Sequence, residues 1–164
     1  MAEKTNKGYL TGKEIRAITK ANAKEMKRLE AYKNRKAEES EFLTEMKNPE
    51  NILEIEDLHT FFYTEQGVVK AVNGVSYDVP KNAVVGVVGE SGCGKSVTWL
   101  AALGLLPKKA TVSGSVQIDG RELIGAAARD LQAVRGKKIA MIFQDPSSSL
   151  NPVHRVGRQI CESL

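Results

Sequence analysis

The segment GESGCGKS, at residues 89–96, directly follows an apolar run at residues 83–88. This G-x-x-x-x-G-K-[ST] pattern lies between a run typical of a buried strand and a helix-compatible run at residues 97–106. Such a unit occurs in α/β folds, where the loop gathers backbone N–H groups at a helix N-terminus to bind phosphate. A glycine-rich turn without a ligand would rarely match every motif position in this context. The sequence therefore predicts an α/β fold that binds a nucleotide.

Each residue type in the segment suits that chemistry. Glycine residues let the backbone wrap closely so that successive N–H groups converge on phosphate oxygens. Lys95 supplies a cation for the β and γ phosphates and is a predicted catalytic residue, while the Ser96 hydroxyl suits magnesium, which prefers hard oxygen donors. For Cys93 we expect the backbone to matter more than the sulfur. The predicted nucleotide-binding residues here are Gly89, Glu90, Ser91, Gly92, Cys93, Gly94, Lys95, Ser96 and Val97.

Composition is that of a soluble protein of about one domain. The chain has 164 residues, 41% of them hydrophobic, and its apolar stretches fall far short of the ~18 residues that span a bilayer. The first residues lack the apolar core of a secretion signal, so we expect a cytoplasmic location. Cys93 and Cys161 have no metal-binding spacing, and neither a zinc site nor a disulfide framework is indicated.

Residues 1–48 form a charged extension with 12 Lys and Arg residues against 8 Glu, which accounts for the whole net charge of +4. Helix is its expected state, with a thin apolar stripe that Asn22 interrupts. Three interpretations stay open: a solvated helix, a surface helix that docks on a partner, or a basic arm for anionic lipid or nucleic acid. The interspersed glutamates argue against the last, and the solvated helix is favoured. We expect no nucleic-acid partner.

The Asn48-Pro49 pair ends the extension, and residues 49–164 are expected to form the folded domain. Short apolar runs separated by tight turns predict an antiparallel sheet before the phosphate loop. A buried strand, a proline-bounded loop and the start of a helix are predicted near the C-terminal end. The predicted strands are 52–58, 68–72, 75–79, 83–88, 111–118 and 139–143, with helices at 97–106, 126–134 and from about 156.

Together, three segments resemble the ATP-binding subunit of an ABC transporter, in the oligopeptide/dipeptide importer branch. These are AVNGVSYDV at 71–79, GESGCGKSVT at 89–98 and IFQDPSSSLNP at 142–152, and the resemblance covers residues 52–164. It implies a P-loop NTPase of the ABC ATPase type, present as its N-terminal half with an antiparallel β subdomain. It also implies an ATPase that binds ATP and Mg²⁺ and energises peptide import from the inner face of the cell membrane.

The same resemblance assigns roles outside the phosphate loop. Gln144 matches the glutamine that reaches the magnesium ion and the nucleophilic water, so it is a predicted catalytic and metal-binding residue. The loop that it starts, 144–152, is expected to contact the membrane permease. Phe62 is the first candidate to stack on adenine, and Tyr63 is the second. A second ATP-binding subunit is an expected partner. An extracellular peptide-binding protein is expected as an indirect partner.

Several parts of the family pattern have no counterpart in this sequence. The LSGGQ-type signature, the acidic motif that ends in Asp-Glu and the late switch histidine are absent. We therefore expect weak Mg-ATP binding, no ATP turnover by the 164-residue chain, and exposed apolar strand edges. One alternative is a short non-catalytic protein that binds nucleotide or competes for the permease. A kinase or GTPase is disfavoured because no N-K-x-D motif is present.

Overall fold

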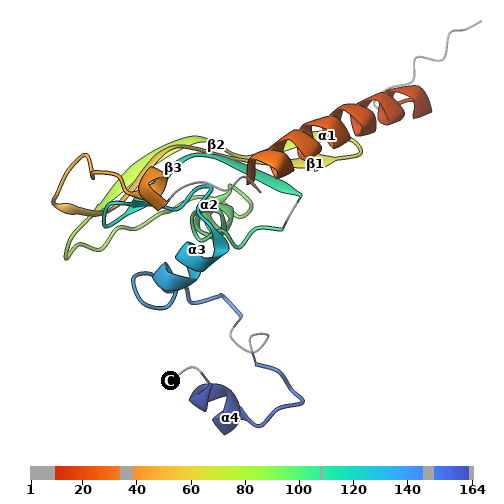
Figure 1. The fold of residues 1–164 in the computed structure, drawn as a ribbon. Coiled ribbons are helices and arrows are strands. Elements are labelled where there is room, and N and C mark those ends of the chain that lie inside the picture. The colour runs from red at the N-terminus through yellow and green to blue at the C-terminus, as the bar shows by residue number, and fades with distance from the viewer. Residues whose placement is uncertain (1–9, 34–38, 108, 146–149, 163–164) are drawn as a thin grey trace, which may run out of the picture.

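A computed structural model describes residues 10–33, 39–107, 109–145 and 150–162 of the chain, and Figure 1 shows the arrangement of its elements. The predicted α/β class is confirmed. Two pairs of consecutive strands are separated by α2, and a short 3-10 helix spans Glu39–Phe42. The helices are α1 (Gly12–Lys33), α2 (Lys95–Ala102), α3 (Ala128–Val134) and α4 (Val156–Cys161). The strands are β1 (Asn51–Thr64), β2 (Gly67–Pro80), β3 (Ala110–Ile118) and β4 (Arg121–Glu122).

The strands form one antiparallel sheet in the order β2-β1-β3-β4, as the tight turns predicted. The prediction of two strands at 68–72 and 75–79 is wrong, because β2 runs through both. Its pairing with β1 shifts register four times, and two of these shifts leave Ala71 and Gly74 as extra residues opposite β1. Gly74 has a φ of 77°, so the chain absorbs a bulge there without ending the strand.

The hydrophobic core lies on one face of this sheet. Leu53, Ile55 and Leu58 of β1 are almost fully buried there, together with residues of β3 and α2. Strict alternation would place Leu58 on the opposite face from Ile55. A register shift after Glu56, where Asp57 has a φ of 45°, restores the inward orientation. Gly114 on β3 permits this bulge, because a β-carbon on it would lie 2.4 Å from the Asp57 carbonyl oxygen.

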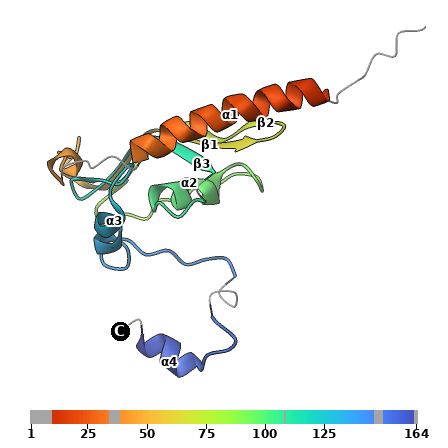
Figure 2. The ribbon, with the colours of Figure 1, turned by 45° about the vertical axis from the view of Figure 1, so that its right-hand side comes forward.

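Helix α1 lies on the other side of the sheet from α2, as Figures 1 and 2 both show. Its stripe of Ile15, Ile18, Asn22, Met26 and Leu29 is half-buried, and the Asn22 side-chain amide donates to a β1 carbonyl. The helix predicted for the extension therefore forms over Gly12–Lys33. It docks on the chain's own sheet instead of lying free in solvent.

The outward face of α1 carries a row of exposed cations. Lys13, Arg16, Lys20, Lys24 and Lys27 recur at helical spacing, and within the described residues none of them forms an ion pair. The glutamates lie elsewhere on the helix. Glu14 accepts hydrogen bonds from Thr11 at the helix start, and Glu25 pairs with Arg28. The charges that look mixed in sequence are thus separated by face in the folded helix.

The segment that joins α1 to the sheet is itself tied to strands. Leu43 forms an isolated bridge with Arg121, and the Thr44 N–H donates to the Gly120 carbonyl at 2.9 Å. At its end, the Glu54 carboxylate accepts the N–H groups of Lys47 at 2.8 Å and Asn48 at 2.9 Å.

Two predicted buried strands, 83–88 and 139–143, are not strands in the described structure. Val84 is 101% exposed, Val88 is 92% exposed and Ile142 is 95% exposed. The bridge between Arg135 and Ile139 is the one ladder contact that these two segments make among the described residues. A buried parallel strand needs hydrogen-bonding neighbours on both edges, and no described segment supplies them here. These apolar segments are exposed as irregular chain, and the expected exposure of apolar strand edges stays a prediction.

Candidate nucleotide-binding site

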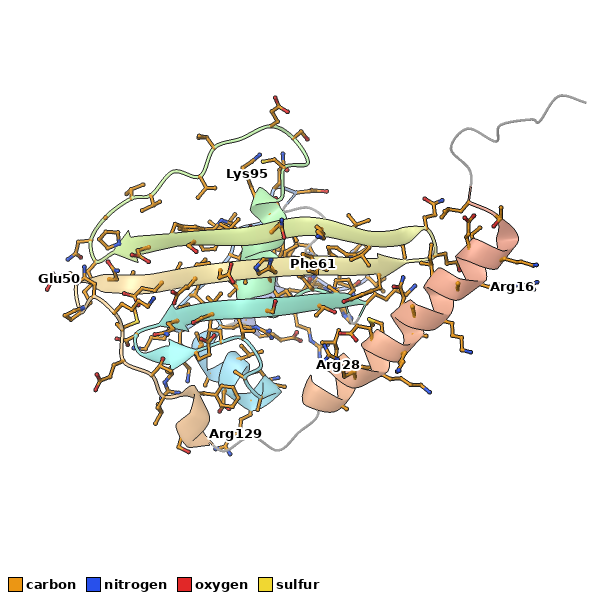
Figure 3. All side chains as sticks on the ribbon, turned by 90° about the horizontal axis from the view of Figure 1, so that it is seen from above. Arg16, Arg28, Glu50, Phe61, Lys95 and Arg129 are labelled. Carbon is orange, nitrogen blue, oxygen red and sulfur yellow. The ribbon has the colours of Figure 1, made fainter. Side chains whose placement is uncertain are left out.

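The glycine-rich loop lies at the N-terminus of α2, on the core side of the sheet and next to β2. In Figure 3, Lys95 marks the end of α2 from which the loop emerges. Gly94 has a φ of 97°, and a β-carbon on it would lie 2.5 Å from the carbonyl oxygen of Ala71. Ala71 is an extra residue of β2, so a bulge in the strand meets the loop at its tightest point. The loop therefore approaches the backbone of β2 closely at Gly94, where a side chain would not fit.

Helix α2 starts and ends earlier than the sequence predicted. It begins at Lys95, so Val97 is already in its first turn, and the Thr98 N–H and hydroxyl both donate to the Gly94 carbonyl. It ends at Ala102, where the predicted helix continued to residue 106. The Arg135 guanidinium donates to the carbonyl of Leu103 through Nε, at 2.8 Å, and through Nη2. A cation at this helix end satisfies a free carbonyl and opposes the helix dipole.

The Lys95 side chain folds back over the loop. Its ammonium group donates to the carbonyl oxygens of Gly89 and Glu90, each at 2.7 Å, and to the sulfur of Cys93 at 3.4 Å. These acceptors are neutral, so a phosphate oxygen would be a stronger partner for the same cation. The Cys93 sulfur also lies close to Gly89, since a β-carbon on Gly89 would lie 2.7 Å from it.

The loop also presents unused donors. Within the described residues, the N–H groups of Gly94, Lys95 and Ser96 donate no hydrogen bond. The first N–H groups of any helix lack intrahelical partners, and the helix dipole adds positive potential there. Free donors beside the Lys95 ammonium are the elements of an anion site.

A cavity of about 360 Å³ opens at this point, and it brings Gln144 to the loop. Ser96 and Gln144 line it together, which places a hydroxyl and an amide oxygen on one cavity. Two hard oxygen donors suit magnesium, which takes its other ligands from water and phosphate. The residues present thus fit Mg-ATP. Part of the loop at 144–152 lies outside the described residues. The lining residues are Ser91, Gly92, Gly94, Lys95, Ser96, Val97 and Gln144.

Phe62 lies on the sheet face that carries the loop. It alternates along β1 with Thr60, which is fully buried on the core side, whereas Tyr63 points to the opposite face. Phe62 pairs with Val69 on β2, two residues from Ala71, where the loop meets the strand. From the spacing of residues and strands in a sheet, the Phe62 backbone lies within about 10 Å of Ala71. This geometry favours Phe62 over Tyr63 as the adenine contact, which stays a prediction.

A family described as "ABC transporter" matches residues 72–162, which include both the loop and Gln144. The chain belongs to the ABC transporter family. Among the described residues, no helix combines the length and apolarity needed to cross a membrane. The ABC transporter assignment confirms the resemblance and the P-loop fold class.

Individual relatives agree with the peptide branch of the family. The chain is 52% identical over 115 residues to a probable peptide ABC transporter ATP-binding protein, y4tR, of Sinorhizobium fredii. The aligned region covers 69% of this chain and 34% of that relative. It is 44% identical over 126 residues to the oligopeptide transport ATP-binding protein OppD of Salmonella typhimurium, covering 76% and 38% respectively. With the dipeptide transport ATP-binding protein DppD of Lactococcus lactis, the identity is 45% over 116 residues, covering 70% and 33%. The chain spans about a third of the length of these relatives.

Sequence reasoning missed three residues that shape the site or its support. Ala71 contacts the loop through its backbone, which carries no sequence signal, and its position depends on a strand bulge. Arg135 caps α2 from the end of α3, a contact that only the packing of the two helices reveals. Asn22 gave a signal as the polar break in an apolar stripe, but its partner on β1 could not be inferred.

Proposed function

We propose that this chain is the N-terminal part of an ATP-binding subunit that energises peptide import through an ABC transporter. The observation that carries the proposal is the single cavity shared by the glycine-rich loop, Ser96 and Gln144. Gln144 follows the loop by a long stretch of chain, so the fold must bring them together. A cavity with a cation, free N–H donors and two oxygen donors matches the chemistry of a nucleotide with its metal ion.

In this proposal the loop holds the phosphates through its backbone. The Lys95 ammonium exchanges the carbonyls of Gly89 and Glu90 for the β and γ phosphate oxygens. Ser96 and Gln144 would hold Mg²⁺, which neutralises charge on the phosphates when it is bound. Gln144 can also orient an attacking water, because its amide offers both a donor and an acceptor without a change of protonation. Phe62 stacks on the adenine ring from β1.

The proposed partners follow from the family and from the names of the relatives. The loop at 144–152 contacts the membrane permease, so that nucleotide occupancy at Gln144 reaches the transport path. A second ATP-binding subunit faces the site, and an extracellular peptide-binding protein delivers the substrate. The chain then works at the cytoplasmic face of the cell membrane as a peripheral subunit.

For the 164-residue chain alone we propose weak Mg-ATP binding without turnover. The sequence contains neither the signature motif nor the acidic motif whose carboxylate polarises water, so the site lacks a base and part of its transition-state electrostatics. An ATPase assay of the chain should give no phosphate release above buffer. Robust turnover that Lys95→Ala abolishes would contradict this part of the proposal.

Calorimetry with ATP, in the presence and absence of Mg²⁺, tests the binding function. Lys95→Met should weaken ATP binding at least about tenfold, since it removes the ammonium group that contacts the loop carbonyls. Gln144→Ala should mainly reduce the gain in affinity that Mg²⁺ provides. Gln132→Ala is the control, because Gln132 is exposed on α3 and does not line the cavity. Equal Mg²⁺ dependence in Gln144→Ala and Gln132→Ala would remove Gln144 from the metal site.

A further inference from the structure

The hairpin that carries Phe62 loses support just beyond that residue. Phe62 pairs with Val69 on β2 and with Ala110, the first residue of β3. The next residues of β1, Tyr63 and Thr64, pair with β2 alone. A two-stranded ribbon is marginally stable in water, so the hairpin tip at 63–68 needs support from another element.

Helix α1 supplies that support on the face opposite the nucleotide cavity. Figure 3 shows α1 running obliquely at the end of the sheet where β1 and β2 turn, and α1 contacts both β1 and β2. The Asn22 Nδ2 donates to the carbonyl oxygen of Thr64 at 2.9 Å. Thr64 pairs with Gly67 and closes the tip with a hydrogen bond from its hydroxyl to the Gly67 carbonyl. Asn22 therefore contacts the tip where the ribbon turns.

The polar break in the stripe of α1 now has a physical reason. An apolar residue at position 22 would bury more hydrocarbon, but it could not satisfy the Thr64 carbonyl. The amide makes one directed contact among half-buried apolar neighbours such as Ile18 and Met26. Those neighbours hold the helix on the sheet, and Asn22 fixes where along the hairpin it rests.

We propose that α1 is a brace for the hairpin that carries Phe62, and that Asn22 is a positioning residue for adenine recognition. This inference rests on the proposed nucleotide function. Ordering the hairpin before binding reduces the conformational entropy that adenine stacking must overcome. The phosphate loop is held separately, through Gly94 and Ala71, so the brace should affect the base end of the ligand and leave the phosphate end unchanged.

Comparing ATP with inorganic tripolyphosphate separates the two ends of the ligand. Both are titrated with Mg²⁺ into the full 164-residue chain and into Asn22→Asp, which keeps the shape of the side chain but loses the donor. Asn22→Asp should weaken ATP binding about fivefold and leave tripolyphosphate binding unchanged. Lys20→Gln, a change on the outward face of the same helix, should alter neither.

Hydrogen exchange provides a second readout that needs no ligand. Amides at 63–69 should exchange faster in Asn22→Asp, while those of β3 should keep their protection. Equal loss of affinity for both ligands, or no change in either, would overturn the brace while leaving the nucleotide site in place. If the unmodified chain bound neither ligand, the proposed nucleotide function would fail, and the positioning role of Asn22 would fail with it.

Discussion

The carbonyl oxygen of Ala71 lies 2.5 Å from the point that a β-carbon on Gly94 would occupy. This contact joins the bulge of β2 to the last turn of the phosphate loop, before α2 begins. Gly92, two residues earlier, also has a positive φ, of 81°, but a β-carbon on it would meet no heavy atom within 4 Å. Substituting Gly92 therefore tests the cost of backbone strain alone, whereas substituting Gly94 adds the cost of a steric clash.

Gly92→Ala and Gly94→Ala should differ clearly in stability. Gly92→Ala should cost about 1–2 kcal/mol, from placing a β-carbon in the left-handed region alone. Gly94→Ala adds a clash with backbone that cannot rotate away, and should cost about 1–3 kcal/mol more. Urea unfolding followed by circular dichroism measures both values. Equal losses would mean that the loop does not rest on Ala71 in solution.

Gly89→Ala should be rescued by a second change in the loop. Its β-carbon would lie 2.7 Å from the Cys93 sulfur, so the single variant should lose about 1 kcal/mol of stability. In a Cys93→Ala background the conflict is gone and most of that loss should disappear. A double-mutant cycle by urea unfolding gives the coupling energy. Additive effects would contradict the contact between the two residues.

The Glu54 carboxylate should make stability depend on acid pH. Burial alone would raise the pKa of Glu54, but the N–H groups of Asn48 and Lys47 and the Asn51 side chain donate to the carboxylate and lower that pKa overall. A lowered folded-state pKa stabilises the fold above the unfolded value of about 4.3, and this contribution is lost as the pH falls through the folded-state pKa.

Glu54→Gln measures that contribution. It should cost about 1–3 kcal/mol at pH 7, because an amide nitrogen then faces an N–H donor. The difference from the unmodified chain should begin to shrink as the pH falls below about 4.3. It should be smallest below the lowered folded-state pKa, because only there is the carboxyl protonated in both folded and unfolded chains. Urea unfolding at a series of pH values checks this. A pH-independent difference would show that packing, not charge, accounts for the loss.

Arg135 should stabilise the chain by capping α2. Arg135→Leu removes both donors to the Leu103 carbonyl and should lower the free energy of unfolding by about 1–2 kcal/mol. Arg135→Lys keeps a cation and should lose less. Arg129→Leu, on the exposed side of α3, is the matched control and should change little. Thermal unfolding of the three variants would test the order, and a loss in Arg129→Leu as large as in Arg135→Leu would refute it.

Local pattern was sufficient for several elements. The glycine motif placed the loop at a helix N-terminus, and the alternation at 111–118 predicted a strand that is observed as β3. It was insufficient for residues 68–79, because a glycine at position 74 reads as a strand break in sequence, whereas in the sheet it is a bulge within β2. Apolar composition also predicted buried strands at 83–88 and 139–143, but burial depends on neighbours that lie elsewhere in a chain.

The amino-acid sequence by itself determined the phosphate-binding motif, the helical extension and the family, since each depends on residue types at fixed spacing. The tertiary structure decided which distant groups meet. It brought Gln144 to Ser96, placed Ala71 against Gly94 and docked Asn22 on Thr64. It also separated the cations of α1 onto one outward face. These relationships depend on strand bulges and on helix packing, and both arise from the competition of all segments for one core, which no local pattern encodes.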